Sequence, residues 1–478
     1  MTGSFTFRPL PNGCLLACLA LPLAMSADVV LKPGDSIQAQ VDRNPPGTSF
    51  LLKSGLYRMQ SIEPKSGDTF SGEKGAVLNG AVVVTPFHKE GPLWVASVQV
   101  QQIRSVGECG PHSPACNLPE DLFVDNVLVP RAMNVEGAGK GHWYLDYGQS
   151  KLYVGDNPEG HEVEMSLART AFSGDVSNVT IRGLTIEKYA SPTGAGAVHG
   201  SEFQRGGKKS VNWIVQDNEI RWNHDVGVWL GHGMHLLHNN LHHNGHMGAG
   251  GSGRNILVEN NEIAYNNYAG YDYHWGAGGA KFVLCANLEV RNNYAHHNEG
   301  PGLWSDIDND NVVYEKNRTS SNKVAGIFFE ISFGAVIHDN IIDNDGENPG
   351  GPRNGAGILV NTSSDADIYG NQITNCATGI LAIQTDRGVS DWTKRTYVLK
   401  NLNVHDNVIT QKSGIAAGID ASPGFMPAAF TDWNNRFQNN TYRFAELTGM
   451  HFEWMRSPRS IEEWKSFHND SNGRFQKL

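Results

Sequence analysis

The sequence has no surplus of positive charge. Its 38 lysines and arginines are outnumbered by 49 aspartates and glutamates, and the formal net charge is −11 at pH 7. Proteins that bind nucleic acids usually carry a clustered basic surface, so this balance argues against a nucleic-acid partner. It is compatible with a neutral sugar polymer as the partner.

Long apolar runs are also scarce. One short run, residues 15–24 (LLACLALPLA), follows Arg8 and ends in small residues, which is typical of a cleaved secretory signal. The run is too short to span a bilayer as a helix, and no later segment is apolar enough to do so. We therefore expect residues 1–27 to be a signal peptide, and the protein to be secreted, extracellular or periplasmic, without a membrane span.

Cysteine is rare as well, with six in the whole chain, four of them after the expected signal. Cys109 and Cys116 flank a loop rich in glycine and proline (CGPHSPAC), and export favours oxidation. The sequence leaves open whether these two cysteines form a disulfide. Cys285 and Cys376 lie inside sequence repeats, where buried thiols are expected.

Motifs for several common chemistries are missing. No GxSxG or phosphate-binding loop occurs where a strand, turn and helix would support it. Six histidines cluster without the compact spacing of a motif such as HExxH, so we expect no zinc site and mostly surface or turn histidines; they are His232, His235, His238, His242, His243 and His246.

What the chain does have is asparagine and glycine in a long repeat. An asparagine followed by one residue and an aliphatic recurs from Asn218 to Asn407 at intervals of 21 to 36 residues. The shorter intervals suit one coil of a β-helix, and the longer ones imply loop insertions. Asparagine tolerates the left-handed backbone of a turn, and stacked asparagines can form a ladder, so we interpret the repeat as structural.

The repeat predicts an all-β fold, a right-handed parallel β-helix in residues 28–478. A short helix beginning near Ser36 is expected to cover the first coil. Residues 81–170 alternate aromatic and β-branched residues with turns, which indicates an inserted antiparallel β region. Regular coils are expected over 171–430. Residues 431–478 are expected to form a C-terminal cap with a short amphipathic helix beginning near Ser460.

A second register lies within each coil, where a glycine precedes a short strand. The residue after the glycine is apolar or aromatic and is placed inward, so strand alternation sends the second and fourth positions outward. The second positions form one outward column, made of Trp229, Asp272, Trp304, Phe328 and Leu359. The fourth positions form another, made of Gly231, His274, Asp306, Glu330 and Asn361.

Asp306 and Glu330 thus fall on consecutive coils of one column. Stacked strands lie about 4.8 Å apart, so the two carboxyl groups are expected roughly 5 Å apart, which suits retaining glycoside hydrolysis better than inversion. Two such charges cannot both ionise easily, so one pKa is expected to rise. Trp304 and Trp229 are candidates for stacking on sugar rings.

His274 below the pair, Asn361 above it and Asp272 in the neighbouring column are candidate substrate contacts. The alternating residues Asp306 to Asn311 also resemble a calcium loop, but the sixth-position glycine and the twelfth-position glutamate are missing. No metal or other cofactor is expected, with calcium left open. Lys281, in a strand one coil earlier, could contact a sugar hydroxyl, neutralise a uronate, pair with a carboxylate or act as a base.

These residues resemble a known family. The stretches GGAKF (278–282), GLWSD (302–306) and GIFFEISFGAVIHDN (326–340) are similar to those of the β-helical β-xylosidases of glycoside hydrolase family 120 and their relatives. The resemblance implies Asp306 as nucleophile, Glu330 as acid/base and Lys281 as a substrate contact. Ile307 stands where the family has an aromatic residue, and Ser332-Phe333 replaces polar residues.

The sequence therefore predicts a secreted, monomeric retaining glycoside hydrolase acting on a plant or microbial polysaccharide or oligosaccharide. One alternative is a polysaccharide lyase or C5-epimerase, in which Lys281, His274 or Tyr271 would abstract a proton next to a uronate. Another is a non-catalytic glycan-binding β-helix, because a fold does not fix a function.

Overall fold

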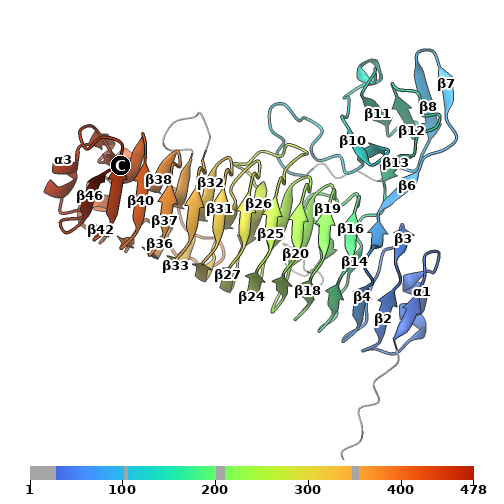
Figure 1. Ribbon diagram of the computed structural model, residues 1–478, viewed down its shortest axis with the longest axis horizontal. Helices are drawn as coiled ribbons and strands as arrows, with labels where there is room; N and C mark the ends of the chain where they lie inside the picture. Colours follow the sequence, from blue (N-terminus) through green and yellow to red (C-terminus); the bar gives the residue numbers. More distant parts are fainter. Residues whose placement is uncertain (1–27, 102–105, 201–209, 347–354) are drawn as a thin grey trace, which may run out of the picture.

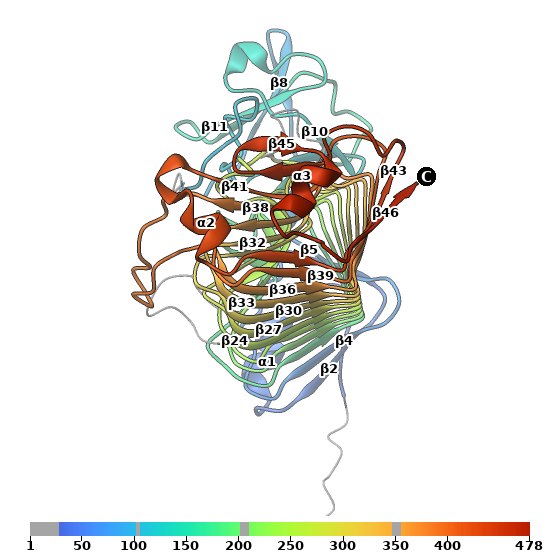
Figure 2. The same ribbon diagram turned by 90° about the vertical axis from the view of Figure 1, so that its left-hand side faces the viewer.

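A computed structural model describes residues 28–101, 106–200, 210–346 and 355–478. The expected signal peptide at residues 1–27 lies outside the described residues. Within the described part of the chain, three long parallel sheets wind around one elongated apolar core (Figures 1 and 2). The predicted right-handed parallel β-helix is confirmed.

Each full coil passes through sheets A, B and C in turn. Sheet A contains, in spatial order, β1 (Val29–Leu31), β2 (Ser49–Leu52), β4 (Thr69–Gly72), β15 (Thr180–Arg182), β18 (Ile214–Gln216), β21 (His235–Leu237), β24 (Arg254–Glu259), β27 (Ala286–Arg291), β30 (Asp310–Glu315), β33 (Phe333–His338), β36 (Ser364–Tyr369), β39 (Asn403–His405) and β42 (Arg436–Gln438).

Sheet B contains β3 (Gly55–Arg58), β5 (Ala76–Asn79), β16 (Thr185–Glu187), β19 (Glu219–Arg221), β22 (Asn240–His242), β25 (Glu262–Ala264), β28 (Tyr294–His296), β31 (Arg318–Ser320), β34 (Ile341–Asp343), β37 (Gln372–Thr374), β40 (Val408–Gln411), β43 (Thr441–Phe444) and β46 (Arg474–Lys477).

Sheet C contains β14 (Phe172–Ser173), β17 (Gly196–His199), β20 (Val226–Leu230), β23 (Met247–Gly251), β26 (Gly278–Val283), β29 (Leu303–Asp306), β32 (Ala325–Glu330), β35 (Ala356–Asn361), β38 (Thr378–Gln384), β41 (Ile415–Ala421), β44 (Phe452–Trp454) and β45 (Ser457–Arg459).

Two small antiparallel sheets project from the side of the solenoid near its first coils (Figure 1). One has the order β10 (Val127–Val129), β9 (Leu122–Val124), β13 (Val163–Ser166) and β6 (Ala81–Val83); the other has the order β11 (Trp143–Asp146), β12 (Lys151–Val154), β8 (Leu93–Ser97) and β7 (His88–Glu90). A separate apolar cluster that includes Trp143, Leu145 and Met165 holds them together. A single 3₁₀ turn, η1 (Val135–Gly137), lies between β10 and β11.

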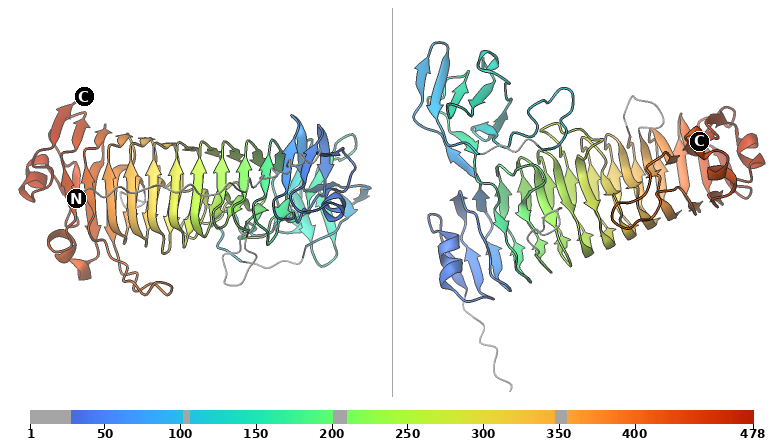
Figure 3. Two further views of the ribbon diagram at one scale, coloured as in Figure 1. Left: turned by 90° about the horizontal axis from the view of Figure 1, so that it is seen from below. Right: turned by 180° about the vertical axis from the view of Figure 1, so that it is seen from behind.

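Helices cover both ends of the solenoid (Figure 3). Helix α1 (Ile37–Arg43) begins at the N-cap Ser36 and buries Ile37 and Val41 against the first coil. Helix α3 (Ile461–Ser466) begins with a capping box between Ser460 and Glu463 and buries its tryptophan in the last coil. Both helices were predicted at these positions. The short η2 (Pro423–Phe425) and α2 (Ala428–Thr431) lie between β41 and β42.

The coils do not stop at residue 430, so the expected end of the regular repeat is wrong. Strand β42 pairs in parallel with β39, β43 with β40, and β46 with β43. The landmark asparagine is still present as Asn440, but an aromatic residue, Tyr442, replaces the aliphatic that follows in earlier coils. That exchange hid the last coil from the sequence pattern.

Two ladders of buried asparagines fix the stacking of the coils. In the first, each side-chain carbonyl accepts from the backbone N–H and the side-chain amide of its counterpart in the preceding coil, from Asn218 to Asp470. The second ladder runs in the same way from Asn223 to Asp345. Every rung satisfies buried polar groups only if neighbouring coils keep one register.

The second ladder explains several of the glycines at the start of the strands of sheet C. A Cβ atom on Gly302 would lie 2.7 Å from the Asn322 side-chain amide nitrogen. The residue after the glycine points inward, as predicted: Leu303, Ile327 and Ile358 are all in the core. Sequence alternation along these strands therefore controls which side chains reach the outer face of sheet C.

The last rung of the second ladder is a carboxyl group, and it gives a test of the ladder. Burial raises the pKa of Asp345 to about 7. The folded state therefore holds this proton more tightly than the unfolded state, so the stability it contributes is present at low pH and is lost as the pH rises from about 4 to about 7. We expect Asp345→Asn to raise the free energy of unfolding at pH 8 by about 2–4 kcal/mol, with little change at pH 4, measured by denaturant unfolding.

Asp470, at the end of the first ladder, is the contrasting control. Its Oδ2 accepts hydrogen bonds from both the Tyr442 hydroxyl and the Trp464 indole. The Oδ2 of Asp345 contacts only the Thr319 hydroxyl, which can either donate or accept a hydrogen bond. An amide NH₂ at Asp470 would face donors, so Asp470→Asn should destabilise at every pH. Equal pH profiles for Asp345→Asn and the unmodified protein would contradict the ladder interpretation.

Candidate active site

The candidate site lies on the outer face of sheet C, at the C-terminal ends of β29 and β32. These adjacent parallel strands pair Leu303 with Ile327 and Trp304 with Phe328, so Asp306 is in register with Glu330. Both carboxyl side chains are largely buried, with 6% and 8% of the residue exposed. The register thus places two carboxyl groups on neighbouring rungs of one column, as the sequence predicted for this pair.

Asp306 has two different carboxyl oxygens. Its Oδ2 lies 2.8 Å from Lys281 Nζ, and its Oδ1 is buried and accepts no hydrogen bond from any described residue. A buried carboxylate oxygen without a donor is costly unless something else, such as a substrate, approaches it. Strand β26, one coil earlier, places Val283 directly beneath Asp306 and brings Lys281 up beside it.

Glu330 contacts a cation and an amide. Arg387 Nη1 lies 2.6 Å from Glu330 Oε1, and Asn361 donates to the same oxygen at 3.0 Å. Burial and, next, the Asp306 charge raise the pKa of Glu330 to about 6, against the lowering effects of Arg387 and Lys281. The rise in one carboxyl pKa that the sequence predicts is therefore found at Glu330.

Lys281 is held from three sides. Its Nζ contacts Asp306, donates to the Trp275 carbonyl at 2.9 Å and lies 3.7 Å from the centroid of the Trp304 ring. Strand register continues through this position, with Gly250 below it and Trp304 above it in the same column. Of the roles open to Lys281 from the sequence, pairing with a carboxylate is the contact present in the structure.

The two tryptophans do not offer open stacking surfaces, which corrects the sequence expectation. Trp304 is 1% exposed, because Lys281 covers one part of its ring and the Phe328 ring stacks on it at 5.2 Å. Trp229 packs in a buried apolar cluster with Met247 and Val283. Both tryptophans are therefore covered by other groups of the protein.

Asp272 and His274 are also misplaced by the sequence pattern. They lie in the loop between β25 and β26. The strand that pairs with β29 in the preceding coil is β26, which follows this loop. The His274 side chain is 68% exposed and contacts Asp272 at 3.0 Å. The long interval between Asn261 and Asn293 had indicated an insertion here, but a glycine followed by an aromatic residue imitated the start of a strand.

Two carboxylates of the Asp306–Asn311 stretch have partners within the protein. The Asp308 carboxylate accepts hydrogen bonds from Ser390 and Tyr397, and Asp310 pairs with Arg395 at 3.1 Å. Across the described ranges, no group of three or more histidines, cysteines, aspartates or glutamates is arranged to hold a metal ion.

The contact of Arg387 with Glu330 was missed from the sequence. It lies in an insertion between β38 and β39, far along the chain from Glu330, and no local pattern marks its target. The 36-residue spacing from Asn371 to Asn407 announces an insertion, but not where it folds.

A disulfide packs against the β25–β26 loop, whose Trp275 carbonyl receives Lys281. Cys109 and Cys116 are bonded, which resolves the question left open by the sequence, and Cys285 and Cys376 are buried free thiols, as expected. The Cys109 loop pairs with the β25–β26 loop, where Gly110 N donates to the Gly270 carbonyl.

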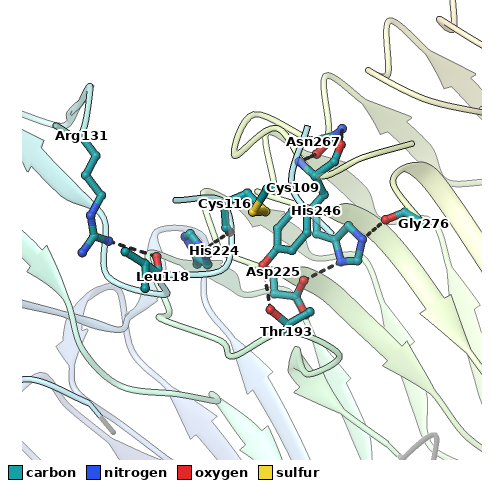
Figure 4. The surroundings of a disulfide bond; sticks show 11 residues. Cys109, Cys116, Leu118, Arg131, Thr193, His224, Asp225, His246, Asn267 and Gly276 are labelled. Carbon is teal, nitrogen blue, oxygen red and sulfur yellow. Dashed lines mark hydrogen bonds and ion pairs between the residues drawn. A yellow bond between two sulfur atoms is a disulfide. The ribbon is translucent and has the colours of Figure 1, made fainter. Parts of the chain in front are cut away.

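The same loop is also held by a buried histidine (Figure 4). His246 contacts Asp225 at 2.6 Å through Nδ1 and the Gly276 carbonyl through Nε2, and its ring stacks on Tyr271. His246 is therefore a buried residue of the turn between β22 and β23. It fixes the backbone next to Trp275, whose carbonyl receives Lys281.

Comparisons with known proteins agree on the architecture. A family profile described as a right-handed beta helix region matches residues 206–373, and no curated protein matches the sequence. XylC, solved in complex with xylose, superimposes with a TM-score of 0.65 at 14% identity, over 92% of this chain and 82% of that chain.

Two further solved structures are similar at a lower level. The catalytic unit of a GH87 α-1,3-glucanase from Streptomyces thermodiastaticus gives a TM-score of 0.48 at 12% identity, covering 95% of this chain and 68% of that one. The A-module of the Azotobacter vinelandii mannuronan C-5 epimerase AlgE4 gives 0.47 at 14%, covering 94% and 93%. The described part of the chain is a right-handed parallel β-helix.

The disulfide provides a test of how the β25–β26 loop is held. We expect the double variant Cys109→Ser/Cys116→Ser to lose about 2 kcal/mol of local stability. Without the disulfide, the eight-residue loop gains conformational entropy when this region unfolds locally. Hydrogen exchange should accelerate at the amides of Gly110 and Asp272, which bond across the two loops. Amides of the distant strand β40 serve as the control, and unchanged exchange at Asp272 would contradict this account.

Proposed function

We propose that this protein is a retaining glycoside hydrolase, with Asp306 as the nucleophile and Glu330 as the general acid and base. The observation that carries the proposal is the asymmetry of the pair: Asp306 keeps one oxygen without a described donor, while burial and the charge of Asp306 raise the pKa of Glu330. Retaining hydrolysis needs this division between an ionised nucleophile and a protonated acid.

The spacing supports retention of configuration. Strands in register lie about 4.8 Å apart, close to the 5–5.5 Å between carboxyl groups of retaining enzymes and short of the 6.5–9.5 Å that inversion requires for a water. Asp306 and Glu330 end adjacent strands in one register. The fold shared with XylC, a protein solved with xylose, is compatible with a sugar substrate.

In the first step, Asp306 Oδ1 attacks the anomeric carbon while the glycosidic C–O bond breaks, and the leaving oxygen takes the proton of Glu330. In the second step, Glu330 removes a proton from water, the water oxygen attacks the anomeric carbon, and Asp306 leaves. Lys281 stays on Oδ2 and orients the nucleophile. The substrate class we propose is a plant or microbial polysaccharide or oligosaccharide, reached by secretion through the signal at residues 1–27.

A lyase or epimerase mechanism is less well supported by the same side chains. Lys281 Nζ is engaged as a donor to the Trp275 carbonyl and against Asp306. His274 points from an exposed loop. Burial raises the pKa of Tyr271 well above its usual value, which disfavours it as a base. None of the three candidate bases therefore presents a free lone pair beside the carboxyl pair.

The central test replaces each carboxyl group. Asp306→Ala and Glu330→Gln should each lower kcat on an activated aryl glycoside or an oligosaccharide by about 10³-fold or more. Azide should restore turnover of Asp306→Ala with a glycosyl azide of inverted configuration, because azide replaces the missing nucleophile.

Glu289→Ala removes an exposed carboxylate of sheet A and should leave kcat unchanged. Full activity in either site variant would overturn the assignment. A product that absorbs in the ultraviolet, as β-elimination generates, would point to a lyase, and glycan binding without any product would point to a binding protein.

A further inference from the structure

The insertion between β38 and β39 forms a defined strap, residues 385–399. Its two ends meet at Gln384, whose side-chain oxygen accepts from Leu399 N. Its arms pair through an antiparallel bridge between Val389 and Thr396, and Tyr397 N donates to the Gly388 carbonyl at 3.1 Å. The strap is thus a small hairpin with a fixed course.

The strap is anchored to the turn that follows the nucleophile. Asp308 accepts from the hydroxyl groups of Ser390 and Tyr397, and Asp310 pairs with Arg395. The Tyr397 ring stacks on Phe333 at 5.6 Å. Of the three alternating aspartates, only Asp306 faces the candidate site, and the other two hold the strap.

Both donors to Glu330 depend on this strap. Arg387, on its first arm, contacts Oε1 directly at 2.6 Å. Asn361 contacts the same oxygen, and its amide is oriented by Thr362, whose hydroxyl donates to Asn361 Oδ1 and accepts from the backbone N–H of Thr385. The beginning of the strap therefore sets one contact and braces the other.

We propose that Arg387 is a positioning residue for Glu330, and that the strap serves to hold its guanidinium against that carboxyl group so that Glu330 can alternate between acid and base. The inference rests on the proposed function of Glu330. Once Asp306 carries the glycosyl group its charge is neutralised, and the cations that remain favour the ionised Glu330 that must activate water.

The charged groups around Glu330 define the expected direction. Asp306 on β29 disfavours its ionised form, whereas Lys281 on β26 and Arg387 on the strap favour it. From β35 it meets the neutral Asn361, and Asp420 follows two coils further along the same column. Removing Arg387 should therefore raise the pKa of Glu330, by about one to two units.

The experiment compares Arg387→Met, Arg387→Lys and the matched control Lys394→Met, an exposed cation of the same strap. Two quantities are followed against pH: kcat/KM for glycoside hydrolysis, and the rate at which a carbodiimide with an amine labels Glu330, read by peptide mass spectrometry. Labelling requires a protonated carboxyl group and no substrate, so it reports on Glu330 even if hydrolysis fails.

In the parent protein the alkaline limb of kcat/KM and the labelling midpoint should both lie near pH 6. Both should move upward by about one to two pH units in Arg387→Met, recover substantially in Arg387→Lys, and stay in place in Lys394→Met. Tyr397→Phe, which loosens the anchor on Asp308, should shift both in the same direction by less.

A labelling midpoint unchanged in Arg387→Met, with the melting temperature retained, overturns the inference whatever the activity. An equal shift in Lys394→Met also overturns it, because the effect would then be one of net charge. A shifted midpoint without hydrolysis of any glycoside would preserve the role of Arg387 and reject the proposed reaction.

Discussion

The register between coils is the constraint on which the structure depends, and buried asparagine amides enforce it. Each rung accepts two hydrogen bonds from its neighbour, so a slip of one residue would leave several polar groups buried and unsatisfied in every coil. Because side chains alternate along a strand, the same slip would turn the core face outward. The ladders therefore determine that Asp306 and Glu330 end neighbouring strands on one face.

Each of the two carboxyl groups in the site has its own cationic partner. Lys281 pairs with Asp306 from an earlier coil, and Arg387 pairs with Glu330 from a later insertion. Lys281, Asp306 and Glu330 are nearly buried, and three such charges would be costly without this pairing. The two pairs differ, however. Burial and the Asp306 charge raise the pKa of Glu330, whereas Asp306 keeps one oxygen with no described donor.

The sequence was sufficient for the features that repeat. The asparagine spacing predicted the β-helix, and alignment on the glycines placed Asp306, Glu330 and Asn361 in one column, because each depends only on its own coil. It was misled at Asp272 and His274, where a loop imitates a strand, and at Trp304, whose burial depends on Lys281 from the preceding coil. It gave no signal for Arg387, since the course of an insertion depends on tertiary contacts such as those made by Asp308.

The intervals between ladder asparagines divide the chain by role. Regular coils, from Asn293 to Asn340, carry the two carboxyl groups, because chemistry needs them on rigid, adjacent strands. The longer intervals on either side, beginning at Asn261 and Asn371, carry the loops that supply Trp275 and Arg387, the partners of Lys281 and Glu330. In a solenoid of this kind, an insertion cannot change the register that the ladder imposes, but it can change what covers a column. We therefore expect the loops in the long intervals to determine the substrate preference of such a site. The regular coils, which carry the carboxyl groups, are expected to determine its reaction.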